Sequence, residues 1–87
     1  MKKHYKNYHI LEVRYLGPTD FKGARVSIFS PRFNQRKIIN FNYEMNSIAD
    51  MAIDYLINIG FYVIGKGESK DGYFIITDTF QPLNKES

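Results

Sequence analysis

The stretch SIADMAIDYLINIG (residues 47–60) decides the fold class, because it has a helical apolar period in a chain whose other patterns are those of strands. Asn46 or Ser47 is expected to cap this helix, and Ser47 with Asp50 three residues later approximates a capping box. The helix is expected to run to about Ile59. The glycine that closes the stretch stands where a left-handed residue commonly follows a helix.

The apolar side of this predicted helix is wide. At about 100° per residue, Ile53 and Ile57 extend the apolar face well around the helix, so one sheet face is not enough to cover it. A long loop or a second subunit would complete the cover. Ile53 and Ile57 are therefore candidate interface residues for a homodimer or another protein partner. The main apolar face comprises Ile48, Ala52, Tyr55, Leu56 and Ile59.

Strand patterns flank the helix on both sides. Apolar and polar residues alternate, and Gly17-Pro18 and Asp71-Gly72 supply turn chemistry between the alternating segments. In the third segment, Ile39 and Phe41 are the expected inward residues. The predicted strands cover residues 8–16, 24–30, about 36–43, 61–65 and 72–80.

These elements predict a single α+β domain over residues 1–87. We expect an antiparallel sheet of about five strands in the order β-β-β-α-β-β, with the one helix packed on one face of the sheet. The ends, residues 1–7 and 82–87, are expected to be frayed.

Composition excludes several classes of protein. The chain has no cysteine, so disulfides and thiolate metal sites are excluded. Its basic start is not followed by the apolar region of a signal peptide, and no apolar stretch approaches the roughly 20 residues of a membrane span. A cytoplasmic bacterial or phage protein without membrane contact is the expected setting.

No segment predicts an active site. The glycines around Lys66 are expected to form a hairpin connection, since a phosphate-binding loop must lead into a helix. Asp50 and Asp54 lie four residues apart on the helix, but no third ligand is near them in sequence. His9 has no partner that would orient it for acid–base work. We therefore expect no enzyme, no metal and no cofactor.

Acidic and basic residues also occur within the predicted strands. Glu12, Arg14 and Asp78 are expected to form ordinary ion pairs across neighbouring strands. A polar ligand groove is the alternative interpretation of these three residues.

Charge is distributed unevenly along the chain. Residues 1–37 carry nine basic and two acidic side chains, a net charge of +7, whereas residues 38–87 carry a net charge of −4. Aromatic residues alternate with the cations of the first half, and this combination suits phosphate charge and unpaired bases. The candidate nucleic-acid contacts are Lys22, Arg25, Arg32, Arg36, Lys37 and Phe33, and the segment Pro31–Lys37 is expected to present three of the cations together.

Two alternatives remain for this basic segment. In the first, Phe29 and Phe33 are core residues and the cations only keep the protein soluble. In the second, the cations bind an acidic protein partner. Nucleic-acid binding by a basic, aromatic-bearing β-meander is the functional hypothesis. Association through the helix, for example as an inhibitor of a host factor, is the alternative.

Residues 8–26 (YHILEVRYLGPTDFKGARV) and 71–83 (DGYFIITDTFQPL) resemble small proteins carried on bacterial phages and conjugative elements. The resemblance covers nearly the whole chain. It implies a mobile-element setting, which favours accessory proteins that handle DNA and inhibitors of host defence. The basic charge of this chain disfavours an inhibitor that mimics DNA.

Overall fold

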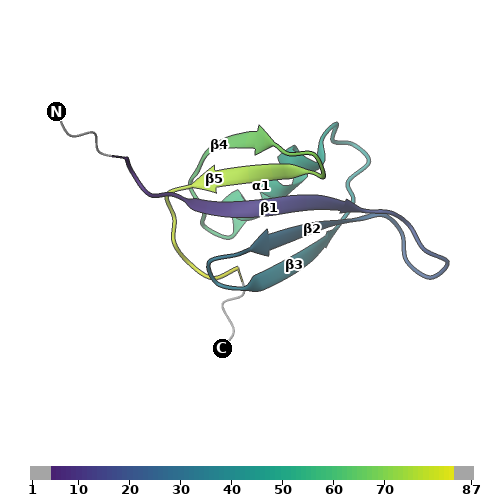
Figure 1. The fold of residues 1–87 in the computed structure, drawn as a ribbon. Helices are drawn as coiled ribbons and strands as arrows, with labels where there is room; N and C mark the ends of the chain where they lie inside the picture. Colours follow the sequence, from purple (N-terminus) through teal and green to yellow (C-terminus); the bar gives the residue numbers. More distant parts are fainter. Residues whose placement is uncertain (1–4, 84–87) are drawn as a thin grey trace.

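The computed structural model describes residues 5–83, and it confirms an α+β chain with one helix and a five-stranded antiparallel sheet. The expected order of elements along the chain is also confirmed. The strands lie in the spatial order β3-β2-β1-β5-β4 (Figure 1). The elements are β1 (His9–Leu16), β2 (Arg25–Ser30), β3 (Gln35–Asn40), α1 (Ile48–Asn58), β4 (Val63–Glu68) and β5 (Tyr73–Thr77).

Strand β1 is the centre of the sheet. It pairs with β2 on one side and with the last strand, β5, on the other, so the two halves of the chain meet along it. Glu12 faces Phe29 in the first pair and Phe74 in the second. Gly72 lies so close to β1 that an added Cβ would be 2.1 Å from the carbonyl oxygen of Val13. Only glycine fits there without a shift of the backbone.

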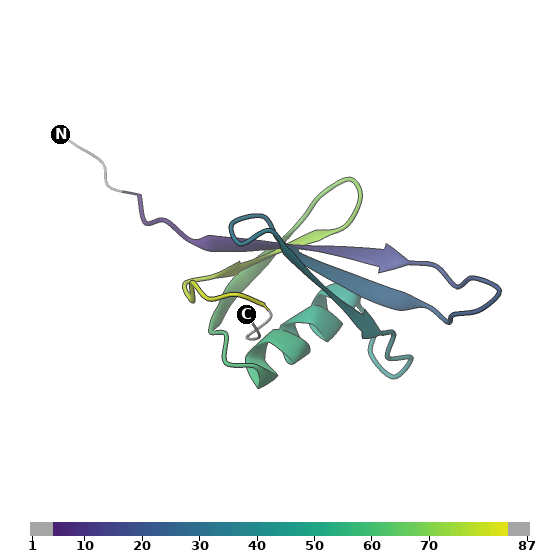
Figure 2. The ribbon, with the colours of Figure 1, turned by 90° about the horizontal axis from the view of Figure 1, so that it is seen from below.

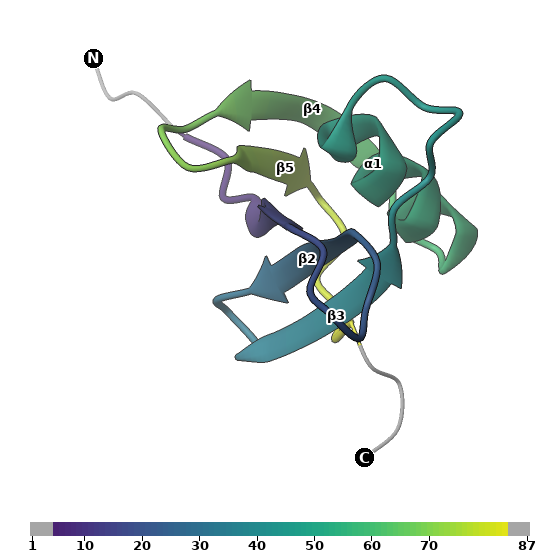
Figure 3. The same ribbon diagram turned by 90° about the vertical axis from the view of Figure 1, so that its right-hand side faces the viewer.

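The core lies between the sheet and α1. Most residues of β1, β2 and β5 that alternate toward the helix are buried, and α1 contacts β1, β2, β4 and β5. Figures 2 and 3 show the helix on one side of the twisted sheet. The largest side chains of the core are Leu11, Val13, Val26, Ile28, Met51, Leu56, Phe61, Ile75 and Leu83.

The ends of α1 follow the predicted chemistry. Ser47 is the N-cap, and its hydroxyl accepts a hydrogen bond from the backbone N–H of Ala49 at 3.2 Å. Asp50 lies in the first turn, where the helix dipole favours an acid, and its carboxylate pairs with Lys66 of β4 at 3.0 Å. The helix ends at Asn58, and Gly60 has a φ of 103°.

The C-terminal segment after β5 covers part of the wide apolar side of α1. Leu83 is only 4% exposed and belongs to the core cluster. The side-chain amide of Gln81 donates to the carbonyl oxygen of Ile59 at 3.3 Å, which joins this segment to the end of the helix. Fraying was expected from residue 82 onward, but the side chain of Leu83 is buried in the core, so the expectation is wrong for this residue. The expectation for residues 1–4 and 84–87 lies outside the described residues.

Strand boundaries differ most at the last hairpin. The predicted connection began at Lys66, but β4 continues to Glu68, and Gly65 and Gly67 pair with Ile76 and Phe74 of β5. Gly67 was predicted to lie in the connection, but it stands at a ladder position of β4. An irregularity between Val63 and Gly65 shifts the register near the start of β4. Within residues 5–83, no helix is long and apolar enough to cross a membrane.

Candidate functional site

The sheet has one face away from α1, which we call the open face. Figure 1 looks onto this face, with the helix behind the sheet. Because side chains alternate along a strand, each core residue of β1 and β2 has neighbours that point to the open face. The strand pairing brings these neighbours together: Ile10, Glu12, Arg14, Arg25, Ser27, Phe29, Arg36, Ile38, Asn40, Phe74 and Ile76.

Arg36 of β3 is held in place on the open face. Its Nη1 donates to the hydroxyl of Ser27 at 2.9 Å, and its guanidinium lies 5.0 Å from the ring centre of Phe29, which is its partner in the β2–β3 ladder. Ser27 is buried although it points to the open face. The hydroxyl and the ring fix the guanidinium plane, and the hydrogen bond uses only one of its five N–H groups. Arg36 is therefore oriented and still able to bind an anion.

Arg14 is the second cation of this cluster. It faces Ser27 across the β1–β2 pair, and its Nη2 is 4.0 Å from Oε1 of Glu12. The pair lies along one strand rather than across two, because residues 12 and 14 point to the same face. The predicted cross-strand pairing is therefore wrong for these two residues. Asp78 lies 3.7 Å from Lys6 instead.

Arg25 is the third arginine of the open face. It stands opposite Leu16 of β1 and Asn40 of β3 and is half-buried. Its Nε is the one buried side-chain N or O atom in the described part of the chain that lacks a hydrogen-bond partner. The register places Arg25 on the same sheet face as Phe29.

The other half of the open face is apolar. Ile10 is 46% exposed, and Phe74 and Ile76 of β5 are half-buried beside it. On the far side of β5, a Cβ added to Gly65 or Gly67 would meet nothing within 4 Å. The face therefore presents a cationic part on β1, β2 and β3 next to an apolar part on β1 and β5.

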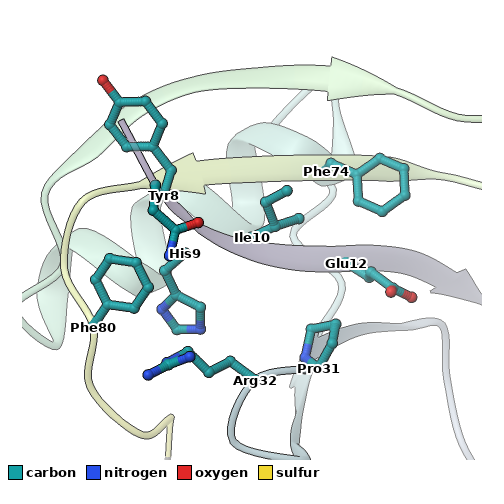
Figure 4. A pocket seen from close by; sticks show the side chains of 9 residues that line it. Tyr8, His9, Ile10, Glu12, Pro31, Arg32, Phe74 and Phe80 are labelled. Atoms are coloured by element: carbon teal, nitrogen blue, oxygen red, sulfur yellow. The ribbon is translucent and has the colours of Figure 1, made fainter. Parts of the chain in front are cut away.

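Two hollows lie on this face and share Glu12. The smaller one, of about 160 Å³, is lined by the cationic cluster of Arg14, Ser27, Phe29 and Arg36. The larger one, of about 400 Å³, is the β1 groove (Figure 4). It lies between β1 and the turn after β2, and its lining comprises Asn7, Tyr8, His9, Ile10, Glu12, Pro31, Arg32, Phe74 and Phe80.

The predicted cations of residues 31–37 do not lie together, so that expectation is wrong. Arg36 and Lys37 are neighbours in β3 and point to opposite faces, and Lys37 faces Ile28 on the helix side. Arg32 lies in the turn, 5.3 Å from the ring centre of Phe80 and 5.9 Å from that of Phe33. Only Arg36 of these three cations belongs to the cluster with Ser27.

Lys22 and Phe33, the remaining predicted contacts, lie away from the cationic cluster. Lys22 lies in the long loop between β1 and β2, where its backbone N–H donates to the hydroxyl of Thr19 at 3.1 Å. Phe33 is half-buried and packs edge-on against His9, with ring centres 5.4 Å apart. Its ring therefore forms part of the packing at one end of the sheet. A nucleic-acid contact by Lys22, Arg32, Lys37 or Phe33 stays a prediction.

His9 joins three segments. It is 1% exposed, its Nδ1 is 2.9 Å from the carbonyl oxygen of Thr79, and its Nε2 is 2.8 Å from the hydroxyl of Ser30. Since a carbonyl only accepts, Nδ1 carries the proton in this contact. The ring also stacks on Phe80 at 5.5 Å. Both nitrogens are engaged, so His9 connects β1, β2 and the C-terminal segment.

The two candidate interface residues on α1 differ in exposure. Ile53 packs against the core cluster, whereas Ile57 is 57% exposed. The sheet and the core residue Leu83 pack against much of the apolar face of α1 from which an interface was predicted. Ile53 is partly buried, and an interface at Ile57 or Ile53 stays a prediction.

Sequence reasoning missed three residues of the open face. Arg14 and Glu12 were predicted to form an ordinary ion pair, with a polar ligand groove as the alternative. Phe74 was predicted to lie in a strand but was not assigned to either face of the sheet. Their alternation with Leu11, Val13 and Ile75 could have revealed them, because it places their side chains on the sheet face away from the core. Within residues 5–83, no group of three or more acids or histidines is placed to hold a metal ion.

Comparisons with known proteins give no relative from which a role can be transferred. No family model, no curated protein and no solved structure matches this chain significantly.

Proposed function

We propose that this protein binds single-stranded nucleic acid on the open face of its sheet. The observation that supports the proposal is the grouping of three arginines with two partly exposed aromatic rings on one sheet face that the helix does not cover. Arg14, Arg25 and Arg36 stand on that face with Glu12 as the only acid among its strand residues. Arginine neutralises phosphate charge and can also stack on a base through its guanidinium plane.

The rings of the open face provide the second element of binding. Phe74 lies on the apolar part, and Phe29 supports the guanidinium of Arg36 at 5.0 Å. A base can therefore stack on the ring of Phe74, and another on the guanidinium plane that Phe29 holds in place. Such stacking contributes about 1–3 kcal/mol per base and tolerates any sequence.

The width of the sheet favours a single strand over a duplex. Five strands spaced about 4.8 Å apart span roughly 19 Å, whereas the major groove of B-DNA is about 12 Å wide. A sheet face of this width does not enter the groove, and paired bases cannot reach its rings. An unpaired strand exposes both its bases and its phosphates to the face.

Equilibrium binding measured by fluorescence anisotropy tests the proposal. We expect a labelled single-stranded 12-mer to bind more tightly than the matching duplex. Phe74→Leu keeps an apolar side chain but removes the stacking ring, so it should weaken single-strand binding about fivefold or more. Phe21→Leu is the matched control, because Phe21 is 96% exposed in the β1–β2 loop, away from the open face. Equal effects of the two substitutions, or a preference for the duplex, would contradict the proposal.

The setting of this activity belongs to the same proposal. The resemblance of residues 8–26 and 71–83 to proteins of bacterial mobile elements supports an accessory role in the bacterial cytoplasm, where single strands arise during transfer or replication of such elements.

A further inference from the structure

The β1 groove contains one acidic side chain, that of Glu12, in a lining that is mostly apolar. Tyr8, Ile10, Phe74 and Phe80 supply much of its apolar surface (Figure 4). Glu12 lines both this groove and the smaller hollow of the cationic cluster. His9 also lines the groove, but both of its nitrogens are engaged. Glu12 is therefore the charged side chain whose acceptors can be directed at a ligand.

Glu12 has a position that phosphate binding alone does not explain. A carboxylate beside Arg14 and near Arg36 weakens the attraction of this face for phosphate. Its nearest cationic atom, Nη2 of Arg14, is 4.0 Å away, which is beyond hydrogen-bond distance. The carboxylate is half-buried, so a donor that meets it is partly shielded from water. A ligand group with N–H donors suits this position.

Among the four bases, guanine has the edge that matches a carboxylate. Its N1–H and N2–H donate side by side, so each can meet one carboxylate oxygen, as a guanidinium does. Cytosine and adenine place an unprotonated ring nitrogen beside their amino group, and uracil and thymine place a carbonyl on each side of N3–H. Each of these alternatives brings a lone pair against the carboxylate.

We infer that the β1 groove binds one guanine of the single strand, with Glu12 as the acceptor for its N1–H and N2–H. This inference rests on the proposed function of the open face. The apolar wall of Ile10 and Phe74 receives the base plane, and the neighbouring phosphates lie toward Arg14 and Arg36. Glu12 is then a specificity-determining residue, and the arginines supply affinity that does not depend on sequence.

Thymidine 9-mers with a single central guanine, cytosine or adenine test the inference against the all-thymidine 9-mer. We expect the wild-type protein to bind the guanine-containing strand about tenfold more tightly, within the range of a bidentate side chain–base pair. Glu12→Gln should abolish this preference, since an amide offers one acceptor and one donor in place of two acceptors. The same substitution should raise affinity for the all-thymidine strand, because it removes a negative charge.

A matched variant separates specificity from charge. Glu44→Gln removes the same charge from an exposed position outside the sheet, and it should leave the guanine preference intact. A wild-type protein without guanine preference would overturn the inference while leaving the proposed function standing. A preference that survives Glu12→Gln would overturn it as well. If no 9-mer binds at all, the proposed function itself is wrong.

Discussion

Salt dependence provides a quantitative test of the arginines on the open face. The perturbation is the double substitution Arg14→Gln with Arg36→Gln, which removes two of the three arginines grouped there with Arg25. Each phosphate neutralised on a single strand contributes about −0.7 to the slope of log affinity against log salt concentration. Three contacts predict a slope of about −2, and the double variant should retain about −0.7.

These slopes predict a large difference over an accessible range. Between 50 and 200 mM salt, wild-type affinity should fall about 20-fold, whereas that of the double variant should fall about threefold. Anisotropy with a labelled single-stranded 12-mer at four salt concentrations gives both slopes. Thermal unfolding of the variant serves as a check, because loss of the hydrogen bond from Arg36 to Ser27 should cost only about 1 kcal/mol.

The control for this measurement is Lys22→Gln with Lys37→Gln. It lowers the net charge by the same two units, but Lys22 lies in the β1–β2 loop and Lys37 faces the helix side. We expect its slope to remain near −2. If the control flattens the slope as much as the arginine variant does, binding follows net charge or the predicted contacts of Lys22 and Lys37, and the arrangement of the open face does not decide it. An unchanged slope in the arginine variant would refute the reasoning equally.

Three further predictions concern the fold. Gly72→Ala should lower the free energy of unfolding by about 2 kcal/mol, because the added Cβ would collide with the Val13 carbonyl. Gly67→Ala is the comparison: its Cβ would meet open space, so the substitution should be neutral or slightly stabilising in chemical denaturation. His9→Leu should cost about 2 kcal/mol or more, because it leaves the buried Ser30 hydroxyl and the partly buried Thr79 carbonyl without their hydrogen bonds to His9. A smaller loss would show that the contacts to His9 are weak. Ile57→Lys should change the free energy of unfolding by less than about 0.5 kcal/mol, and its molar mass in light scattering should equal that of the wild-type protein. A lower molar mass for the variant would show that Ile57 lies in a subunit interface.

Local patterns predicted the elements of this fold because their causes are local. The cap at Ser47, the positive φ of Gly60 and the alternation of β2 follow from neighbouring residues. The expectation that Ile39 and Phe41 point inward also implied that Lys37 points to the same side. The cluster of cations expected at residues 31–37 ignored this alternation, and it was wrong for that reason.

Strand order was the missing information for the site. Glu12 and Phe74 meet only because β5 pairs with β1, and no local signal in either segment specifies that neighbour. The packing of Phe33 on His9 likewise depends on a contact between distant segments. The β1 groove therefore becomes visible only once the two halves of the sheet are joined.

The central claim is that a single strand binds on the open face, and side-chain nuclear magnetic resonance tests it most directly. In a titration with the thymidine 9-mer, the Nε–H signals of Arg14 and Arg36 should shift together and saturate at one affinity. The backbone signals of Asp54 and Ile57, on the exposed side of α1, should stay in place. Shifts confined to α1 or to the β1–β2 loop, with both arginine signals unmoved, would contradict the claim.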